Sequence, residues 1–280
     1  MKVITRNLIS LPGALLLTAL MSMSVSAHIQ TESSSFPDIK SSEARFDITV
    51  LVGVGVIPET SVFEPKRKFS RSDLAAWSAL SASLLEKTEG KPDVNALAKA
   101  ALDKGLVKSL EGDASYAEIN AVFFQGKNKP AQPDAVPTRA EAASYIVTGL
   151  VTPVAGSLLE KSGQHAGPTG VVAKVESRAN ADGGESVFIT IGEQTLPMYT
   201  HGRVGNGPSD LAKWSGRTVR RSFIRTQGEF STWAYLESET VAGDADEPAH
   251  DHSAHKHADG DEETQAKSGT DEHAEHKHAE

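Results

Sequence analysis

The chain has 280 residues and a formal net charge of −9 at pH 7. We expect no nucleic-acid partner for so acidic a chain, because phosphate backbones are bound by basic surfaces. It contains no cysteine, which excludes structural disulfides, a lipid-modified N-terminal cysteine and thiolate metal sites.

Residues 1–27 have the three-part pattern of a secretory signal peptide. Basic residues precede an apolar stretch over residues 8–21, and small residues end the segment at Ala27. Pro12 and Gly13 interrupt the apolar stretch, which makes an uncleaved anchor the weaker alternative. We therefore expect export to the periplasm or cell envelope, with no transmembrane segment after cleavage.

Residues 28–40 are predicted to be a flexible N-terminus. Cleavage after Ala27 would make His28 the first residue. An N-terminal histidine can chelate copper through its amino group and ring nitrogen, and chance placement is the alternative interpretation.

Residues 41–152 are predicted to form a helical module of two repeated units. In each unit an amphipathic helix ends at glycine, and a second helix follows a loop. The second helices start with a hydroxyl and an acid three residues later, which indicates a capping box. These pairs are Ser70 with Asp73 and Thr138 with Glu141.

This pattern resembles the S-layer homology family, whose repeat joins two helices through a glycine turn and a loop and opens the second helix with a TRAE-type motif. The first unit carries the matching residues Gly55, Phe63, Pro65, Ser70, Arg71 and Asp73. The second keeps Lys104 to Val107 and Pro137 to Glu141, with a longer middle. The family usually has three repeats, and two are visible here.

The resemblance implies attachment to cell-wall polysaccharide, with Arg71 and Arg139 in the positions of the arginine that helps to hold anionic sugar groups. A basic side chain beside free amides at a helix N-terminus is a suitable anion site. The alternative is a purely structural helical domain with ordinary surface arginines.

Residues 153–168 are rich in glycine, proline and serine and are predicted to be a linker. Residues 169–241 then alternate apolar and polar side chains, which predicts five antiparallel strands with one short helix. We expect a small barrel of the OB or SH3-like kind. Four arginines, at positions 217, 220, 221 and 225, form either its solvated side or a binding face.

Residues 242–280 are predicted to be a disordered acidic tail that binds metal. The last 31 residues hold seven of the ten histidines. Imidazole suits zinc, nickel and copper. The candidate ligands are His250, His252, His255, His257, His273, His276 and His278. The alternative is an inert solubilising tail.

No zincin motif, nucleophile elbow or cysteine nucleophile is present, so we do not expect an enzyme. A carbohydrate-active enzyme with its site in the barrel is a weaker possibility. The sequence thus predicts an α+β multidomain protein: a helical module, a small antiparallel β-barrel and a disordered tail. Its expected function is binding of zinc, nickel or copper for buffering or delivery to a transporter. The alternative is an envelope attachment protein that binds wall polysaccharide.

Overall fold

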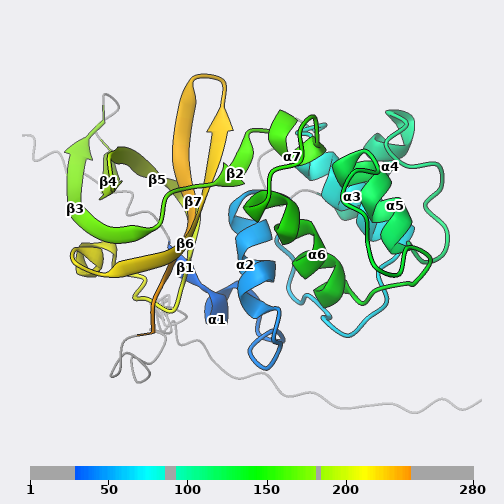
Figure 1. The fold of residues 1–280 in the computed structure, drawn as a ribbon, viewed down its shortest axis with the longest axis horizontal. Coiled ribbons are helices and arrows are strands. Elements are labelled where there is room, and N and C mark those ends of the chain that lie inside the picture. Colours follow the sequence, from blue (N-terminus) through cyan, green and yellow to red (C-terminus); the bar gives the residue numbers. More distant parts are fainter. Residues whose placement is uncertain (1–28, 86–92, 181–183, 241–280) are drawn as a thin grey trace, which may run out of the picture. The chain divides into compact units, whose positions relative to one another are not determined.

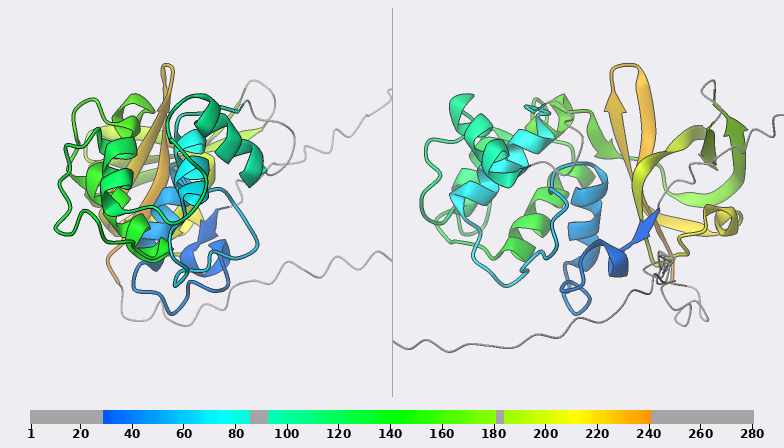
Figure 2. Two further views of the ribbon diagram at one scale, coloured as in Figure 1. Left: turned by 90° about the vertical axis from the view of Figure 1, so that its right-hand side faces the viewer. Right: turned by 180° about the vertical axis from the view of Figure 1, so that it is seen from behind.

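The computed structural model describes residues 29–85, 93–180 and 184–240 (Figure 1). All of them belong to one compact unit, Met1–Glu247. The predicted signal peptide, His28 and the histidine-rich tail lie outside the described residues. Within the described part, helices pack beside a β-barrel, so the predicted α+β fold with a barrel is confirmed (Figures 1 and 2).

The helical part has five helices of two turns or more and two short ones. Their bounds are Glu32–Ser35 (α1), Arg45–Gly53 (α2), Arg71–Ser81 (α3), Val94–Asp103 (α4), Tyr116–Phe124 (α5), Arg139–Val151 (α6) and Leu158–Lys161 (α7). Buried aromatic rings fill the space between them. Trp77 on α3 lies 6.0 Å from Phe63 and 4.8 Å from Phe69, measured between ring centroids. None of the helices in the described ranges is both long and apolar enough to span a bilayer.

Capping boxes with an acid at the third helical position open three of these helices, α3, α5 and α6. In each box a hydroxyl accepts the amide of the acid three residues later, and the acid accepts the amide of the capping residue. The pairs are Ser70 with Asp73, Ser115 with Glu118, and Thr138 with Glu141. The first and third confirm the prediction. The second lies in the stretch predicted to be a lengthened loop, which instead contains α5.

The β part is a sheet of seven strands. Their bounds are Gln30–Thr31 (β1), Gln164–Ala166 (β2), Gly170–Ala179 (β3), Glu185–Ile191 (β4), Gln194–Gly205 (β5), Thr218–Gln227 (β6) and Phe230–Ser238 (β7). Five of them close into a barrel in the order β3-β4-β5-β7-β6 and back to β3. The short strands β1 and β2 pair with β5 and β6.

The barrel differs from the prediction in one pairing. β5 and β7 run parallel, whereas the other closing pairs are antiparallel. A parallel pair needs a long connection, and here it contains the short helix at Leu211–Trp214 and all of β6. The observed architecture is thus a closed five-stranded barrel with one parallel pair.

The N-terminal segment is ordered, contrary to the prediction of flexibility over residues 28–40. Its described part contains β1 and α1, and Phe36 and Ile39 are buried in the helical core. The Phe36 ring lies 5.6 Å from that of Phe63. The carboxylate of Asp38 accepts the backbone amides of Phe63 and Glu64. Contacts with residues distant in the sequence therefore hold a segment whose local composition indicates a loop.

The predicted linker, residues 153–168, is also part of the fold, because it forms α7 and β2. The side chain of Gln164 is buried; its oxygen accepts the Ser81 hydroxyl, and its nitrogen donates to the carbonyl of Val54. Glycine, proline and serine here serve turns and a helix cap, with Ser157 accepting the amide of Glu160. The segment anchors the barrel to the helices and does not separate two domains.

A shared hydrophobic core joins the two parts. Phe223, Ala234 and Tyr235 of the barrel belong to the same buried cluster as the apolar residues of the helices. Helix α2 lies against the barrel (Figures 1 and 2). Its residue Gly53 has no room for a side chain, because a Cβ there would lie 2.5 Å from the carbonyl oxygen of Ala234.

Gly53→Ala should therefore destabilise the protein by about 1–3 kcal/mol, although alanine favours helices more than glycine does. The added methyl group forces α2 away from β7. Asn95→Ala, at an exposed position of α4, is the matched control and should leave stability unchanged or slightly raised. Urea denaturation measures both effects, and a Gly53→Ala protein as stable as the control would contradict this packing.

Candidate functional site

The N-terminal ends of α3, α5 and α6 come together, and the loops before them are hydrogen-bonded to one another. The amide of Phe69 donates to the carbonyl of Pro137, and the carbonyl of Phe69 accepts the amide of Ala114. The amide of Arg139 likewise donates to the carbonyl of Arg67. This is the region that contains Arg71 and Arg139, the two residues predicted to bind anionic sugar groups.

Arg139 is buried in this region and is neutralised within the protein. Its guanidinium donates to Asp73, and its Cζ atom lies 4.7 Å from the ring centre of Phe63 and 5.4 Å from that of Trp77. Burial lowers the pKa of Arg139, and the charge of Asp73 partly offsets this effect. Asp73 also accepts hydrogen bonds from Arg67 and Ser70. An external anion would have to displace Asp73 to reach this arginine.

Arg71 is more accessible, with 35% of its side chain exposed, but it too has a partner. Its Nε donates to Glu118 at 2.6 Å, and its Nη1 donates to the carbonyl of Glu111 at 2.8 Å. Burial alone would raise the pKa of Glu118, but hydrogen bonds from Arg71 and Ser115 outweigh it and lower the pKa. Arg71 therefore links the starts of α3 and α5.

A second charged cluster lies where the barrel meets the helices, and its centre is the fully buried carboxylate of Glu237 on β7. Arg220 and Arg221 on β6 both donate to it, the latter at 2.6 Å. The hydroxyl of Tyr235 adds a third bond at 3.0 Å. Burial raises the pKa of Tyr235 well above its ordinary value, and the negative charge of Glu237 adds to that rise.

This cluster extends to the helices through Asp47 on α2. Nη1 of Arg221 donates to Asp47 at 2.8 Å, and the other oxygen of Asp47 accepts the hydroxyl of Ser144 on α6 at 2.8 Å. Burial alone would lower the pKa of Arg221, but its bonds to Asp47 and Glu237 outweigh burial and raise it. The chain of contacts thus runs from β7 through β6 and α2 to α6.

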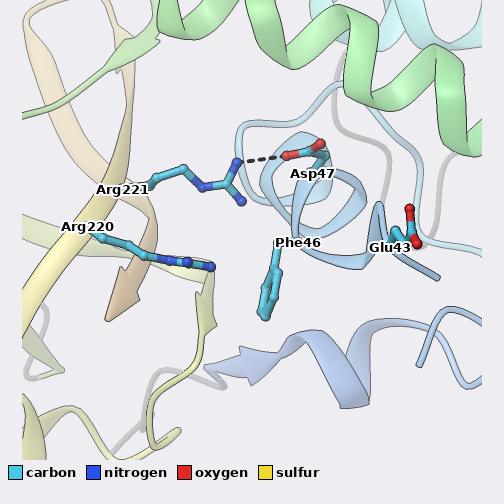
Figure 3. A pocket seen from close by; sticks show the side chains of 5 residues that line it. All are labelled: Glu43, Phe46, Asp47, Arg220 and Arg221. Carbon is cyan, nitrogen blue, oxygen red and sulfur yellow. Dashed lines mark hydrogen bonds and ion pairs between the residues drawn. The ribbon is translucent and has the colours of Figure 1, made fainter. Parts of the chain in front are cut away.

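A cavity of about 360 Å³ opens beside this cluster. Its lining residues are Glu43, Phe46, Asp47, Arg220 and Arg221. Figure 3 shows Phe46 and Asp47 of α2 beside Arg220 and Arg221 on β6, with Glu43 on the far side of Phe46. The guanidinium of Arg220 lies 5.6 Å from the centre of the Phe46 ring. Of the four arginines predicted to form a solvated side or a binding face, two therefore line a cavity.

The other two arginines differ from this pair. Arg225 lies with its guanidinium 5.5 Å from the Tyr199 ring centre and close to Gly55. Nε of Arg217 donates to the carbonyl of Lys213 at 3.0 Å. The four arginines thus do not form one face: Arg217 precedes β6, and two irregularities in the pairing of β6 with β7 separate the other three.

No group of three or more metal-ligand side chains exists within residues 29–85, 93–180 and 184–240. The two histidines of this part, His165 on β2 and His201 on β5, lie on different strands. His201 is exposed. The seven predicted metal ligands of the tail lie outside the described residues.

Sequence reasoning missed three features of these sites. The Ser115 and Glu118 pair has the spacing of a capping box and could have been found by the rule that identified the other two. The partnership of Asp47 with Arg221 joins residues far apart in the chain and leaves no local pattern. The same holds for the burial of Glu237, which follows several apolar residues of β7.

Neither protein-family models nor curated protein sequences gave a match to this chain. Arguments about its function therefore depend on its own residues.

Arg139→Ala should cost about 3–5 kcal/mol of stability, because it leaves the buried carboxylate of Asp73 without its main partner. Arg71→Ala removes a solvent-screened ion pair and should cost much less stability than Arg139→Ala. Urea unfolding of the two variants beside the wild type checks this contrast. Equal losses in the two variants would show that Arg139 does not have the buried structural role described.

Proposed function

We propose that the protein is an exported, non-enzymatic metal-binding protein that captures zinc, nickel or copper with its C-terminal tail. The observation that carries this proposal is the concentration of seven of ten histidines in the last 31 residues. Two near-copies of a short segment, HDHSAHKH and DEHAEHKH, contain all seven. Several imidazoles within a few residues can converge on one borderline divalent ion.

The composition around the histidines supports cation binding. Residues 244–280 contain twelve carboxylates and three lysines. The negative charge attracts cations and offers occasional oxygen ligands, while imidazole nitrogen selects transition metals over calcium and magnesium. Reversible coordination of this kind suits buffering, or delivery to a metal transporter.

The described part supports the same assignment by what it lacks. Within its three ranges no set of three candidate ligands converges, and its carboxylates at the two charged clusters are already paired with arginines. A metal bound with micromolar affinity or better would therefore depend on residues outside these ranges, and seven of the eight histidines there belong to the tail.

Calorimetric titration of the mature protein with zinc, copper and nickel tests the proposal. The full chain should bind at least one of these ions with micromolar affinity at about pH 7.5, and binding should weaken as the pH falls through about 6.5, since the ligands must be neutral imidazoles. The first comparison is a chain that ends at Gly243. The second keeps the tail but replaces its seven histidines with glutamine, which preserves length and carboxylates.

Loss of binding in both variants supports imidazole coordination by the tail. Unchanged binding in the chain that ends at Gly243 would overturn the proposal. If only the glutamine variant still binds metal, the tail coordinates it through carboxylates and not histidines, which would also overturn the proposal.

A second candidate function is attachment to wall polysaccharide. What favours it is the third capping box with an acid, Ser115 with Glu118, which gives the described helical part three such boxes, as many as the S-layer homology family usually has repeats. The accessible cation among the predicted residues is Arg71, whereas Arg139 is buried.

Sedimentation with purified cell-wall sacculi tests this second function. If it is correct, Arg71→Ala should reduce the bound fraction, while Lys99→Ala, which removes an exposed lysine of α4, should not. Arg139→Ala is unsuitable here because it is expected to disturb the fold. Wild-type protein that stays in the supernatant, or equal binding by Arg71→Ala, would exclude attachment through this arginine.

A further inference from the structure

A second cavity, of about 310 Å³, lies beside the barrel, and the N-terminal segment forms part of its wall. Strands β3 and β4 line one part of it, and the short helix Leu211–Trp214 with the residues next to it lines another. Ile29, the first described residue, completes the lining. Like Val175 and Val187 of the same cavity, it packs against the core of the barrel. The pairing of β1 with β5 begins at the next residue and holds the chain in this place.

The residue before Ile29 must therefore also lie close to this cavity. Consecutive Cα atoms across a trans peptide bond are about 3.8 Å apart, so His28 stays within one residue of the cavity wall. Cleavage after Ala27, which the signal-peptide pattern predicts, converts the peptide nitrogen of His28 into a free amino group. Processing thus creates a positive charge beside the cavity.

The rest of the lining suits an ammonium group. Asp210 is the one charged side chain among the described residues that line the cavity. Its Oδ1 accepts the amide of Ala212 at 3.0 Å, and its Oδ2 has no partner within residues 29–85, 93–180 and 184–240. Three hydroxyls, those of Ser177, Ser209 and Ser215, add oxygen atoms that no described residue uses. An ammonium group has three N–H donors and no acceptor, so a carboxylate with several hydroxyls satisfies it.

The tether decides between this amino group and an amine from solvent. A free amine would meet the same oxygen atoms, but the ammonium group of the mature chain is attached one residue from the cavity. So short a link keeps it at a high effective concentration, and a free amine competes poorly with it.

We propose that the mature N-terminus docks in this cavity, with the ammonium group of His28 paired with Asp210 and hydrogen-bonded to the serine hydroxyls. A precursor cannot form this pair, because its nitrogen at this position is an uncharged peptide nitrogen that carries residues 1–27. Signal cleavage therefore completes the native state. Docking also occupies the amino group that copper chelation by His28 would need. The inference rests on the export part of the proposed function and does not depend on the histidine-rich tail.

The first test examines the amino group of the full-length exported protein. N-terminal sequencing should show that the chain begins at His28. The pKa of this group is then measured from the pH dependence of its reaction with an amine reagent, with mass spectrometry of the N-terminal peptide as readout. The carboxylate of Asp210 should raise this pKa by about one unit above the ordinary value of about 7.7–8.0, because it stabilises the charged form. Asp210→Asn should return the pKa to that value.

Urea unfolding gives an independent test with a matched control. Asparagine caps a helix as well as aspartate does, so Asp210→Asn keeps the bond to Ala212 and removes the charge. It should lower the unfolding midpoint of the mature protein more than that of a chain that begins at Val25, whose ammonium group lies three residues further away. Asp93 caps α4 through the amide of Asn95 in the same way, and Asp93→Asn should have equal effects in the two chains.

Three results would overturn the proposal. The first is an exported chain that begins at a residue other than His28. The second is an ordinary pKa for the amino group of the mature protein. The third is an equal effect of Asp210→Asn in the chains that begin at His28 and at Val25, because the carboxylate would then act without the ammonium group. None of these measurements involves a metal, so docking and metal capture by the tail are judged separately.

Discussion

The fold depends on compensation of one buried charge, the carboxylate of Glu237. A carboxylate with no exposed surface is costly in a protein interior unless cations and hydrogen bonds satisfy it. Here two guanidiniums and the Tyr235 hydroxyl do so, and one of the guanidiniums reaches on to Asp47. The groups that satisfy the carboxylate belong to β6 and β7, and Arg221 links them to Asp47 on α2. The same guanidinium therefore satisfies the barrel's buried charge and ties the barrel to the helices.

A comparable principle orders the helical part. There the buried pair of Arg139 and Asp73 lies among aromatic rings, and the capping boxes of neighbouring helices surround it. Asp73 caps α3 and at the same time receives Arg67 and Arg139, so one carboxylate fixes a helix start and the contact between two helices. An arginine that a motif assigns to ligand binding can thus pair with a carboxylate inside the protein. Its position in a motif does not show whether it is free to bind a ligand.

The sequence predicts the parts of this fold that are governed by near neighbours. The capping boxes at Ser70 and Thr138 follow from residues three apart, and alternation identifies the barrel strands. The predictions are wrong for segments whose structure depends on distant residues. Phe36 packs on Phe63, and Gln164 is hydrogen-bonded to Ser81 and Val54. The sequence does not predict the cavity between α2 and β6 for the same reason, since its lining residues Glu43 and Arg220 are far apart in the chain. Composition alone, by contrast, marks the histidine-rich tail.

The pairing of β1 with β5 has a consequence for how the chain reaches its native state. Gln30 of β1 pairs with Arg203 of β5, so β1 cannot form its hydrogen bonds until a segment much later in the chain has been synthesised. Contacts this distant in sequence require closure of a long loop before they yield any gain, and topologies rich in them fold slowly. For a chain that crosses a membrane unfolded, as the proposed export requires, such a delay is useful. The N-terminal strand cannot join the sheet until β3, β4 and β5 have all been made.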